Sequence, residues 1–255
     1  MLKPDESLFD FSNAPGTYHF LLDIPPANRY FHISQAIRTK QQEEVIDLLK
    51  VKPARVVAVK SYSDLGPWDG IPTMVRHYRV ARFLWKNYLP TAWIAGELFF
   101  APLNYVSEQK VPTDKIFQVE PCDWGDVGYY AQHWKEWVEE VSLLTKRVTI
   151  PLKIERGLEG KFIILPISAQ QRKKMEWLEI RMSASEEDLF SLVDREYLDR
   201  DIRSRILFAT KVGENQIYRI PISSCLQWHY FPSEVYLSWS KASQKIQKIS
   251  FIEGQ

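Results

Sequence analysis

Beyond residue 146 the sequence alternates between apolar and polar side chains with a period of two residues, and this pattern limits the possible folds more than any other feature. In the run 176–184, for example, Leu178, Ile180 and Met182 are separated by single residues, which is typical of a strand that buries one face. Short strands at intervals of roughly 8–13 residues, separated by Gly, Asn and Pro turns, predict an antiparallel β-sandwich or jelly roll. The candidate strands are 147–154, 161–167, 176–184, 188–193, 205–212, 216–222, 234–239 and 246–252.

The first part of the chain has a different pattern, in which extended and helical runs alternate. Residues 16–24 are predicted to form a strand because of their β-rich composition, and 54–59 form a continuously apolar run that is typical of a buried strand. A helix is expected from Thr39 to the breaker Pro53, and another over 74–88. The run 91–100 is expected to form a strand pair or one bent strand, with its bend at Gly96. This order predicts a small α/β domain with a short, mostly parallel sheet and at least one right-handed crossover.

These patterns predict two domains of different class, α/β followed by all-β. We expect the α/β domain over 1–106, a linker over 107–125 and a helix plus the antiparallel sandwich over 126–255. The linker assignment follows from the prolines and the missing helical periodicity of residues 102–123. One apolar face of the expected helix is formed by Tyr130, Trp134, Trp137, Val141 and Leu144.

The charge balance excludes some classes of partner. The 255 residues include 33 Lys and Arg against 32 Asp and Glu, which leaves a formal net charge of +1. General nucleic-acid binding requires a basic surface, so no nucleic acid is expected as a partner. No apolar run approaches the ~20 residues that are needed to span a bilayer.

The sequence contains only two cysteines, Cys122 and Cys225, and they are far apart. A zinc ribbon or a disulfide-dense scaffold is therefore excluded. In an oxidising compartment the two residues would be able to form a disulfide that closes a long loop, worth roughly 4–5 kcal/mol. In a reducing compartment they would be two free thiols, and the sequence leaves both alternatives open.

The common signatures of enzymes are missing from the sequence. There is no GxGxxG, GxxxxGK[ST], GxSxG or HExxH motif, so we predict no catalytic residue, no metal site and no cofactor. The five histidines are scattered without the spacing of paired metal ligands, and we interpret them as packing residues.

The loop 63–72 is the first candidate site for carbohydrate, because it follows the predicted strand 54–59 where α/β folds place their ligands. In this loop Asp64 and Asp69 would hydrogen-bond sugar hydroxyls or act in acid–base chemistry, and Trp68 would stack on a sugar ring. The alternative is ordinary turn chemistry, with Trp68 covering the core.

The second candidate is the aromatic segment 224–232, which connects two predicted strands. Exposed Trp228, His229 and Tyr230 at the rim of a sandwich would form a carbohydrate-binding surface, since an aromatic ring matches the apolar face of a sugar. The alternative is a hydrophobic plug that closes one end of the sandwich.

An ordered series of motifs connects the chain to a known family. RYFHI (29–33), T-x-x-Q-x-E-V-I-x-x-L (39–49), K-P-A-R-V-V-A-V (52–59) and N-Y-x-P-T-A (87–92) occur in this order. The series resembles the soluble region after the last membrane helix of polytopic glycosyltransferases of the dolichyl-phosphate-mannose-dependent mannosyltransferase type. The segment Y-R-I-P-I-S-S-C-L-Q-W-H-Y (218–230) is similar to galactose-binding-like sandwich domains.

The resemblance implies a soluble domain on the extracytoplasmic (periplasmic) face of a membrane, beside a membrane-embedded body that uses a lipid-linked sugar. It implies no catalytic residue in this chain, because the catalytic acids of such transferases lie in the membrane-embedded part. Our first hypothesis is therefore a non-catalytic ectodomain that contacts glycan or acceptor, or packs on the membrane body. The alternatives are a stand-alone carbohydrate-binding protein and a soluble carbohydrate-active enzyme that uses Asp64 and Asp69.

Overall fold

A computed structural model describes residues 6–12, 17–30, 33–60, 71–157, 160–197, 202–232 and 234–254 of the chain. The chain divides into two compact units, unit 1 (Met1–Glu120) and unit 2 (Pro121–Gln255). Residues 107–125, which were expected to be a linker, are shared between the two units: they include helix α5 (Thr113–Ile116) of unit 1 and strand β5 (Cys122–Asp123) of unit 2. The chain combines α/β and β structure in several sheets.

Unit 1 contains a four-stranded sheet with the strand order β1-β2-β4-β3. Its strands are β1 (Leu8–Asp10), β2 (Val56–Lys60), β3 (Tyr88–Ile94) and β4 (Glu97–Pro102). Strands β1 and β2 are parallel, but β4 is antiparallel to both β2 and β3, so the prediction of a mostly parallel sheet is wrong. The reason is the tight turn at Ala95 and Gly96, whose φ angles of 51° and 85° are those of a two-residue hairpin turn, which can only join antiparallel strands.

The helices of unit 1 agree with the sequence patterns in part. Helix α2 (Thr39–Val51) forms as expected and buries Val45 and Leu49. The helix expected over 74–88 is divided at His77 into α3 (Thr73–Arg76) and α4 (Tyr78–Asn87). Two 3-10 turns complete the unit, η1 (Ile33–Gln35) and η2 (Leu103–Tyr105).

The strand predicted over 16–24 is wrong, because this segment contains helix α1 (Thr17–Leu22). Two of its apolar side chains face solvent: Phe20 is 86% exposed and Leu22 is 54% exposed. The parallel neighbour of β2 is instead β1, whose Leu8 and Phe9 are buried. A β-rich composition therefore did not determine the structure of this segment, because strand propensity depends on packing against neighbouring strands.

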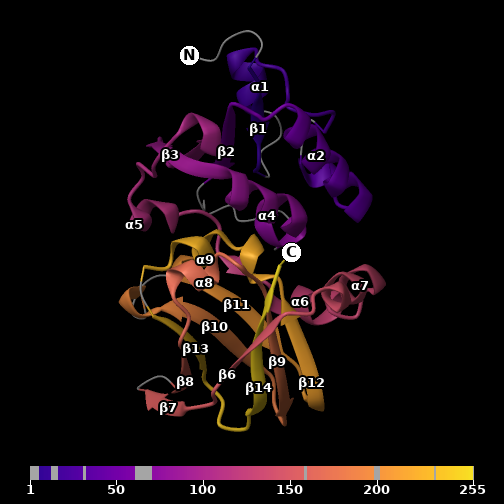
Figure 1. The fold of residues 1–255 in the computed structure, drawn as a ribbon, viewed down its shortest axis with the longest axis vertical. Coiled ribbons are helices and arrows are strands. Elements are labelled where there is room, and N and C mark those ends of the chain that lie inside the picture. The colour runs from indigo at the N-terminus through magenta and orange to yellow at the C-terminus, as the bar shows by residue number, and fades with distance from the viewer. Residues whose placement is uncertain are drawn as a thin grey trace. The chain divides into compact units, whose positions relative to one another are not determined.

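Unit 2 contains a six-stranded sheet with the order β5-β11-β10-β13-β8-β7 and a four-stranded sheet with the order β12-β9-β14-β6 (Figure 1). Every predicted run contains a strand, and the run 147–154 contains parts of two strands, one in each sheet, separated by Pro151. All pairs are antiparallel except β5 with β11. The strands are β6 (Arg147–Ile150), β7 (Ile154–Gly157), β8 (Gly160–Leu165), β9 (Met175–Ala184), β10 (Asp188–Asp194), β11 (Arg205–Thr210), β12 (Gly213–Ile220), β13 (Val235–Trp239) and β14 (Lys245–Glu253).

The expected helix after residue 125 is interrupted. It forms as α6 (Gly125–Ala131) and α7 (Lys135–Leu143), and the break removes Tyr130 and Trp134 from the buried face, where both had been expected. These two side chains are 58% and 57% exposed, whereas Trp137 is buried. The short helices of unit 2 are α8 (Ala169–Arg172), α9 (Leu226–Tyr230), η3 (Arg195–Tyr197), η4 (Ile202–Ser204) and η5 (Ile222–Ser224).

Aromatic side chains dominate the core of unit 2. Trp137 contacts both Trp124 and Trp177 edge-to-face, with ring centroids 5.6 and 4.9 Å apart. On the six-stranded sheet Phe190 stacks between Phe208 and Trp239, with both centroid distances 5.4 Å. Such pairs stabilise a core beyond the burial of their area, by about 0.5–1.5 kcal/mol each.

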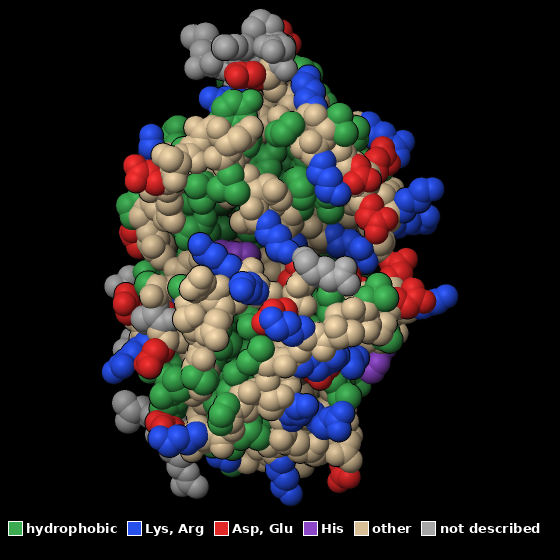
Figure 2. Space-filling model, in the orientation of Figure 1, with side chains coloured by type: hydrophobic (Ala, Val, Ile, Leu, Met, Phe, Trp, Pro, Cys, Tyr) green, Lys and Arg blue, Asp and Glu red, His purple; other side chains and the backbone are tan. Residues whose placement is uncertain are grey.

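The surface of the molecule carries charges of both signs. Lys and Arg side chains are interspersed with Asp and Glu side chains over the face shown in Figure 2, in agreement with the net charge of +1. Among the described residues, no helix is both long enough and apolar enough to cross a bilayer.

Candidate functional site

The first predicted site, formed by Asp64, Trp68 and Asp69, lies in residues 61–70, which are outside the described residues. The strand that precedes it, β2, ends at Lys60. The interpretation of this loop as a carbohydrate site therefore stays a prediction.

The second predicted site, the aromatic segment 224–232, is part of the core of unit 2. The Trp228 side chain is fully buried, and its ring stacks on Phe251 of β14 at a centroid distance of 5.6 Å. Its Nε1 donates a hydrogen bond to the carbonyl oxygen of Arg172, 3.1 Å away. The prediction of an exposed Trp228 that stacks on sugar is wrong, and the alternative of a hydrophobic plug describes this residue.

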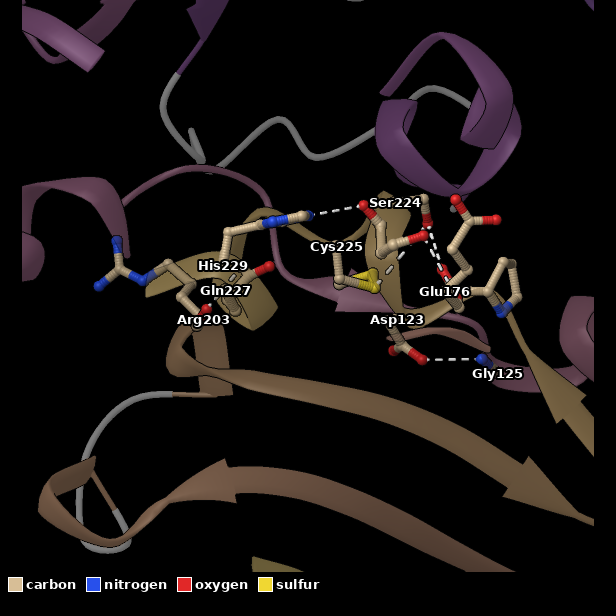
Figure 3. The surroundings of a disulfide bond; sticks show 11 residues. Asp123, Gly125, Glu176, Arg203, Ser224, Cys225, Gln227 and His229 are labelled. Atoms are coloured by element: carbon tan, nitrogen blue, oxygen red, sulfur yellow. Dashed lines mark hydrogen bonds between the residues drawn. A yellow bond between two sulfur atoms is a disulfide. The ribbon is translucent and has the colours of Figure 1, made fainter. Parts of the chain in front are cut away.

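The neighbours of Trp228 also have structural contacts. His229 lies with its Nε2 2.8 Å from the carbonyl oxygen of Ser223, near the disulfide shown in Figure 3. Burial raises the pKa of the Tyr230 phenol above its usual value. Both side chains are half-buried, so no open aromatic platform is formed by the three predicted residues.

A substitution at Trp228 separates the two interpretations. We expect Trp228→Phe to lower the free energy of unfolding by about 1–2 kcal/mol, because it removes volume and the hydrogen bond to Arg172 from the core. Urea unfolding measures this change, and the matched control is Trp134→Phe at an exposed position, where less than about 0.5 kcal/mol is expected. If both variants changed the free energy of unfolding by the same small amount, the interpretation of Trp228 as a buried hydrophobic plug would be contradicted.

Cys122 and Cys225 are joined by a disulfide bond. Of the two alternatives that the sequence left open, a disulfide or two free thiols, the structure has the disulfide. Their Cα atoms are 5.5 Å apart, and both residues are fully buried. The bond connects β5, at one end of the six-stranded sheet, to the residue that precedes helix α9 (Figure 3). In the same strand Asp123 accepts a hydrogen bond from the amide of Gly125 at 2.9 Å, and burial raises the pKa of its carboxyl.

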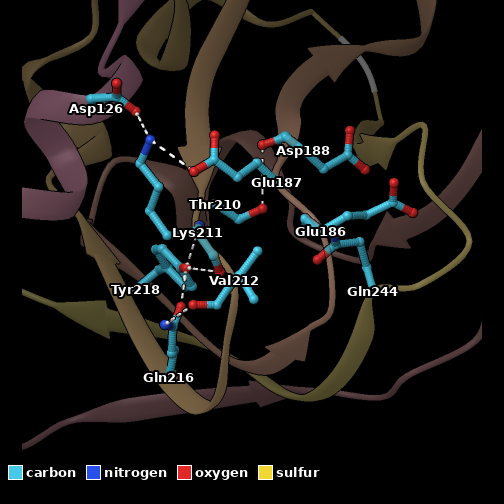
Figure 4. A network of polar contacts seen from close by, with 10 residues as sticks. All are labelled: Asp126, Glu186, Glu187, Asp188, Thr210, Lys211, Val212, Gln216, Tyr218 and Gln244. Atoms are coloured by element: carbon cyan, nitrogen blue, oxygen red, sulfur yellow. Dashed lines mark hydrogen bonds and ion pairs between the residues drawn. The ribbon is translucent and has the colours of Figure 1, made fainter.

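A polar network in unit 2 surrounds Lys211, and its groups satisfy one another (Figure 4). The Lys211 ammonium lies 2.7 Å from Asp126 and 3.3 Å from Glu187. The Tyr218 hydroxyl accepts a hydrogen bond from the backbone amide of Lys211 at 2.8 Å and donates one to Gln216. These contacts connect α6 with the strands, and we interpret the network as structural.

A group of polar side chains in unit 1 has no signature in the sequence. It is formed by Asp10, Ser12, Lys60 and Glu97, and we call it the Asp10 cluster. Asp10 ends β1, Lys60 ends β2, and Glu97 begins the antiparallel strand β4, so the three lie toward the same edge of the sheet. This is the edge at the carboxyl ends of the parallel strands, where open α/β sheets bind ligands. A polar residue directly after the buried pair Leu8 and Phe9 was the available signal, but β1 has only three residues and was not recognised.

The described residues contain no group of three or more His, Cys, Asp or Glu side chains that is arranged to hold a metal ion. Comparisons of the chain with family models, curated proteins and solved structures found no match.

Proposed function

We propose that the chain is an extracytoplasmic, non-catalytic module that works beside the membrane-embedded body of a glycosyltransferase. The observation that carries this proposal is the buried disulfide between Cys122 and Cys225. Disulfides form and persist in secreted and periplasmic proteins and are rare where glutathione and thioredoxin keep thiols reduced. The bond therefore supports the compartment that the ordered motifs of residues 29–94 imply.

The architecture proposed for unit 2 is a jelly-roll sandwich of the galactose-binding-like kind. The support is that each sheet carries fully buried apolar side chains, Ile180 and Met182 on β9 and Phe190 and Leu192 on β10. A sheet with such residues must pack on a second layer, and two sheets in one compact unit can supply that layer to each other.

The partners in this proposal are the membrane-embedded body and a glycan or lipid-linked sugar. Trp228 does not contact them in this proposal, because its ring is buried in the core. The hypotheses of a stand-alone carbohydrate-binding protein and of an enzyme that uses Asp64 and Asp69 stay predictions.

The redox state of the protein in its own cells tests the proposal. Cells are quenched in acid, free thiols are blocked, and the protein is then reduced and labelled with a maleimide that adds mass. We expect Cys122 and Cys225 to be labelled only after reduction, and the protein to be recovered with the membrane fraction.

The control for this experiment is a Cys122→Ala, Cys225→Ala variant, which takes up no label at any step. Free thiols at both positions in the quenched cells would contradict an extracytoplasmic location. Oxidised protein that is recovered without any membrane protein would contradict the association with a membrane body.

A further inference from the structure

Asp10 is the last residue of an edge strand of the unit 1 sheet. Strand β1 has three residues and a single neighbouring strand, β2, to which it is parallel. Just beyond the strand, the amide of Phe11 donates a hydrogen bond of 2.9 Å to the carbonyl oxygen of Ala58. A short strand at the edge of a sheet opens more readily than a strand at its centre. The state of the Asp10 side chain therefore affects how tightly β1 is held.

Asp10 and Glu97 place two carboxyl groups on one face of this sheet. In the parallel pair Asp10 lies beside Ala58, and in the antiparallel pair Glu97 lies beside Lys60. Residues in register share a face, and Ala58 and Lys60 are two residues apart on β2. Both carboxyls therefore lie on the face of Ala58, which is small and fully buried.

The two carboxyls lack a full set of hydrogen-bond donors. Asp10 is only 5% exposed, and its Oδ1 accepts a hydrogen bond of 2.6 Å from the Ser12 hydroxyl. Its Oδ2 is buried without a hydrogen-bond partner among the described residues, and so is Oε2 of Glu97. Two carboxylates in this position would lose their water and repel each other, whereas a proton on the pair reduces both costs.

The buried aspartate of unit 2 has a different arrangement. Asp188 is 8% exposed, and both of its oxygens have donors. Oδ1 accepts from Ser240 and from the amide of Leu189, and Oδ2 accepts from the amide of Lys241, all within 2.8 Å. Donors of this kind compensate a carboxylate for the water that it loses on burial, and the free oxygens of the pair in unit 1 have no such compensation.

The electrostatics of unit 1 agree with this geometry. Burial raises the pKa of Asp10 to about 6, against the opposing effects of Ser12 and Lys60, and burial with the charge of Asp10 raises the pKa of Glu97. If β1 leaves the sheet, Asp10 returns to water and to its ordinary pKa of 3.8. The open form is therefore favoured by deprotonation, and its population grows as the pH rises through about 6.

We propose that Asp10 and Glu97 form a pH-dependent catch for β1. With a proton on the pair the strand is held on β2, and with both carboxyls charged it opens more often. The catch concerns unit 1 alone and needs no particular compartment, so it goes beyond the proposed function. Free thiols in cells would overturn the proposed function and leave the catch standing.

Other titratable side chains lie near β1. Helix α1 packs on the face of the pair, where the ring of Tyr18 meets Phe99 edge-to-face at 6.2 Å, and it also carries His19. Phe11 contacts the buried ring of His77. Because histidines titrate in the same pH range, variants of the two carboxyls are needed to assign a pH dependence to the pair.

Hydrogen exchange of the full, isotopically labelled chain, followed by NMR between about pH 5 and pH 7.5, tests the catch. The protection factor removes the intrinsic pH dependence of exchange. For the amide of Phe11, which is bonded to Ala58 across the strand pair, it should fall about tenfold over this range. The buried amide of Ala81 in α4 should be better protected at every pH, because β1 opens while the rest of unit 1 stays folded.

Two variants and a matched control assign the effect. Asp10→Asn removes the titrating group and Glu97→Gln adds an amide donor to the pair, so each should reduce the fall in Phe11 protection. Asp47→Asn, at a side chain that is 72% exposed on α2, should show the same fall as the wild type.

Three results would overturn the proposal. The first is a Phe11 protection factor that does not change with pH in the wild type. The second is a fall that persists unchanged in both carboxyl variants, which would assign it to a histidine. The third is equal protection of Phe11 and Ala81, which would mean that β1 opens only when the whole of unit 1 unfolds.

Discussion

Replacing Cys122 and Cys225 together by alanine should lower the free energy of unfolding of unit 2 by about 4–5 kcal/mol. The bond joins residues that are 103 positions apart, so its loss returns a large conformational entropy to the unfolded chain. Alanine is the suitable replacement because both positions are fully buried and a serine hydroxyl would lack a partner there. Urea unfolding followed by tryptophan fluorescence measures the loss.

The reductant supplies the control for this prediction. Dithiothreitol should destabilise the wild-type protein by a similar amount and leave the double-alanine variant unchanged. A wild-type protein whose unfolding curve is insensitive to reductant would show that the bond does not stabilise the native state.

Asp10→Asn should stabilise unit 1 in a way that depends on pH. The folded state raises the pKa of Asp10 from 3.8 to about 6, so it holds the protonated form better than the unfolded chain does. The stabilisation from this group is present below pH 3.8 and is lost as the pH rises through about 6. The variant does not titrate, so its stability relative to the wild type should grow by about 2–3 kcal/mol between pH 4 and pH 7.

Denaturant unfolding at a series of pH values measures this difference, and Asp47→Asn on the exposed face of α2 is the control. The charged groups that face Asp10 are Lys60 and Glu97, and the protonation of Glu97 would broaden the transition without changing its sign. Parallel stability curves of the wild type and Asp10→Asn would refute the raised pKa.

Strand β9 was predictable because over residues 178–184 its buried and more exposed side chains alternate, a period of two residues that the sequence records directly. Strands such as β10 and β13 are buried on both faces and were recognised as short apolar runs between turns. The sheet of unit 1 was less predictable. Strand β1 is too short to show a period, and segment 16–24 has the composition of a strand although it is a helix with exposed Phe20. The sequence predicted either a strand pair or one bent strand over 91–100, and the turn at Ala95 and Gly96 makes it a pair, with β4 antiparallel to β3.

For the sites too, features that depend on nearby residues could be predicted from the sequence, and features that depend on distant residues could not. The sequence named Trp228 for its aromatic character, but its burial depends on Phe251 and Arg172, which lie elsewhere in the chain. With two cysteines the sequence allowed only one pairing, but whether Cys122 and Cys225 meet depended on the fold, which brings their Cα atoms to 5.5 Å from each other. The Asp10 cluster is formed by residues of three separate strands, so no local sequence motif could predict it.

Strand β5 has a further consequence for how the protein avoids self-association. It occupies the end of the six-stranded sheet by pairing with Ile206 and Leu207 of β11, and the disulfide fixes it there. An unprotected strand edge is a template on which other chains can add, and this short segment covers the part of the β11 edge at Ile206 and Leu207. The disulfide thus has a second effect besides restraining the unfolded chain: it holds β5 on β11, so that other chains cannot pair with the residues that β5 covers.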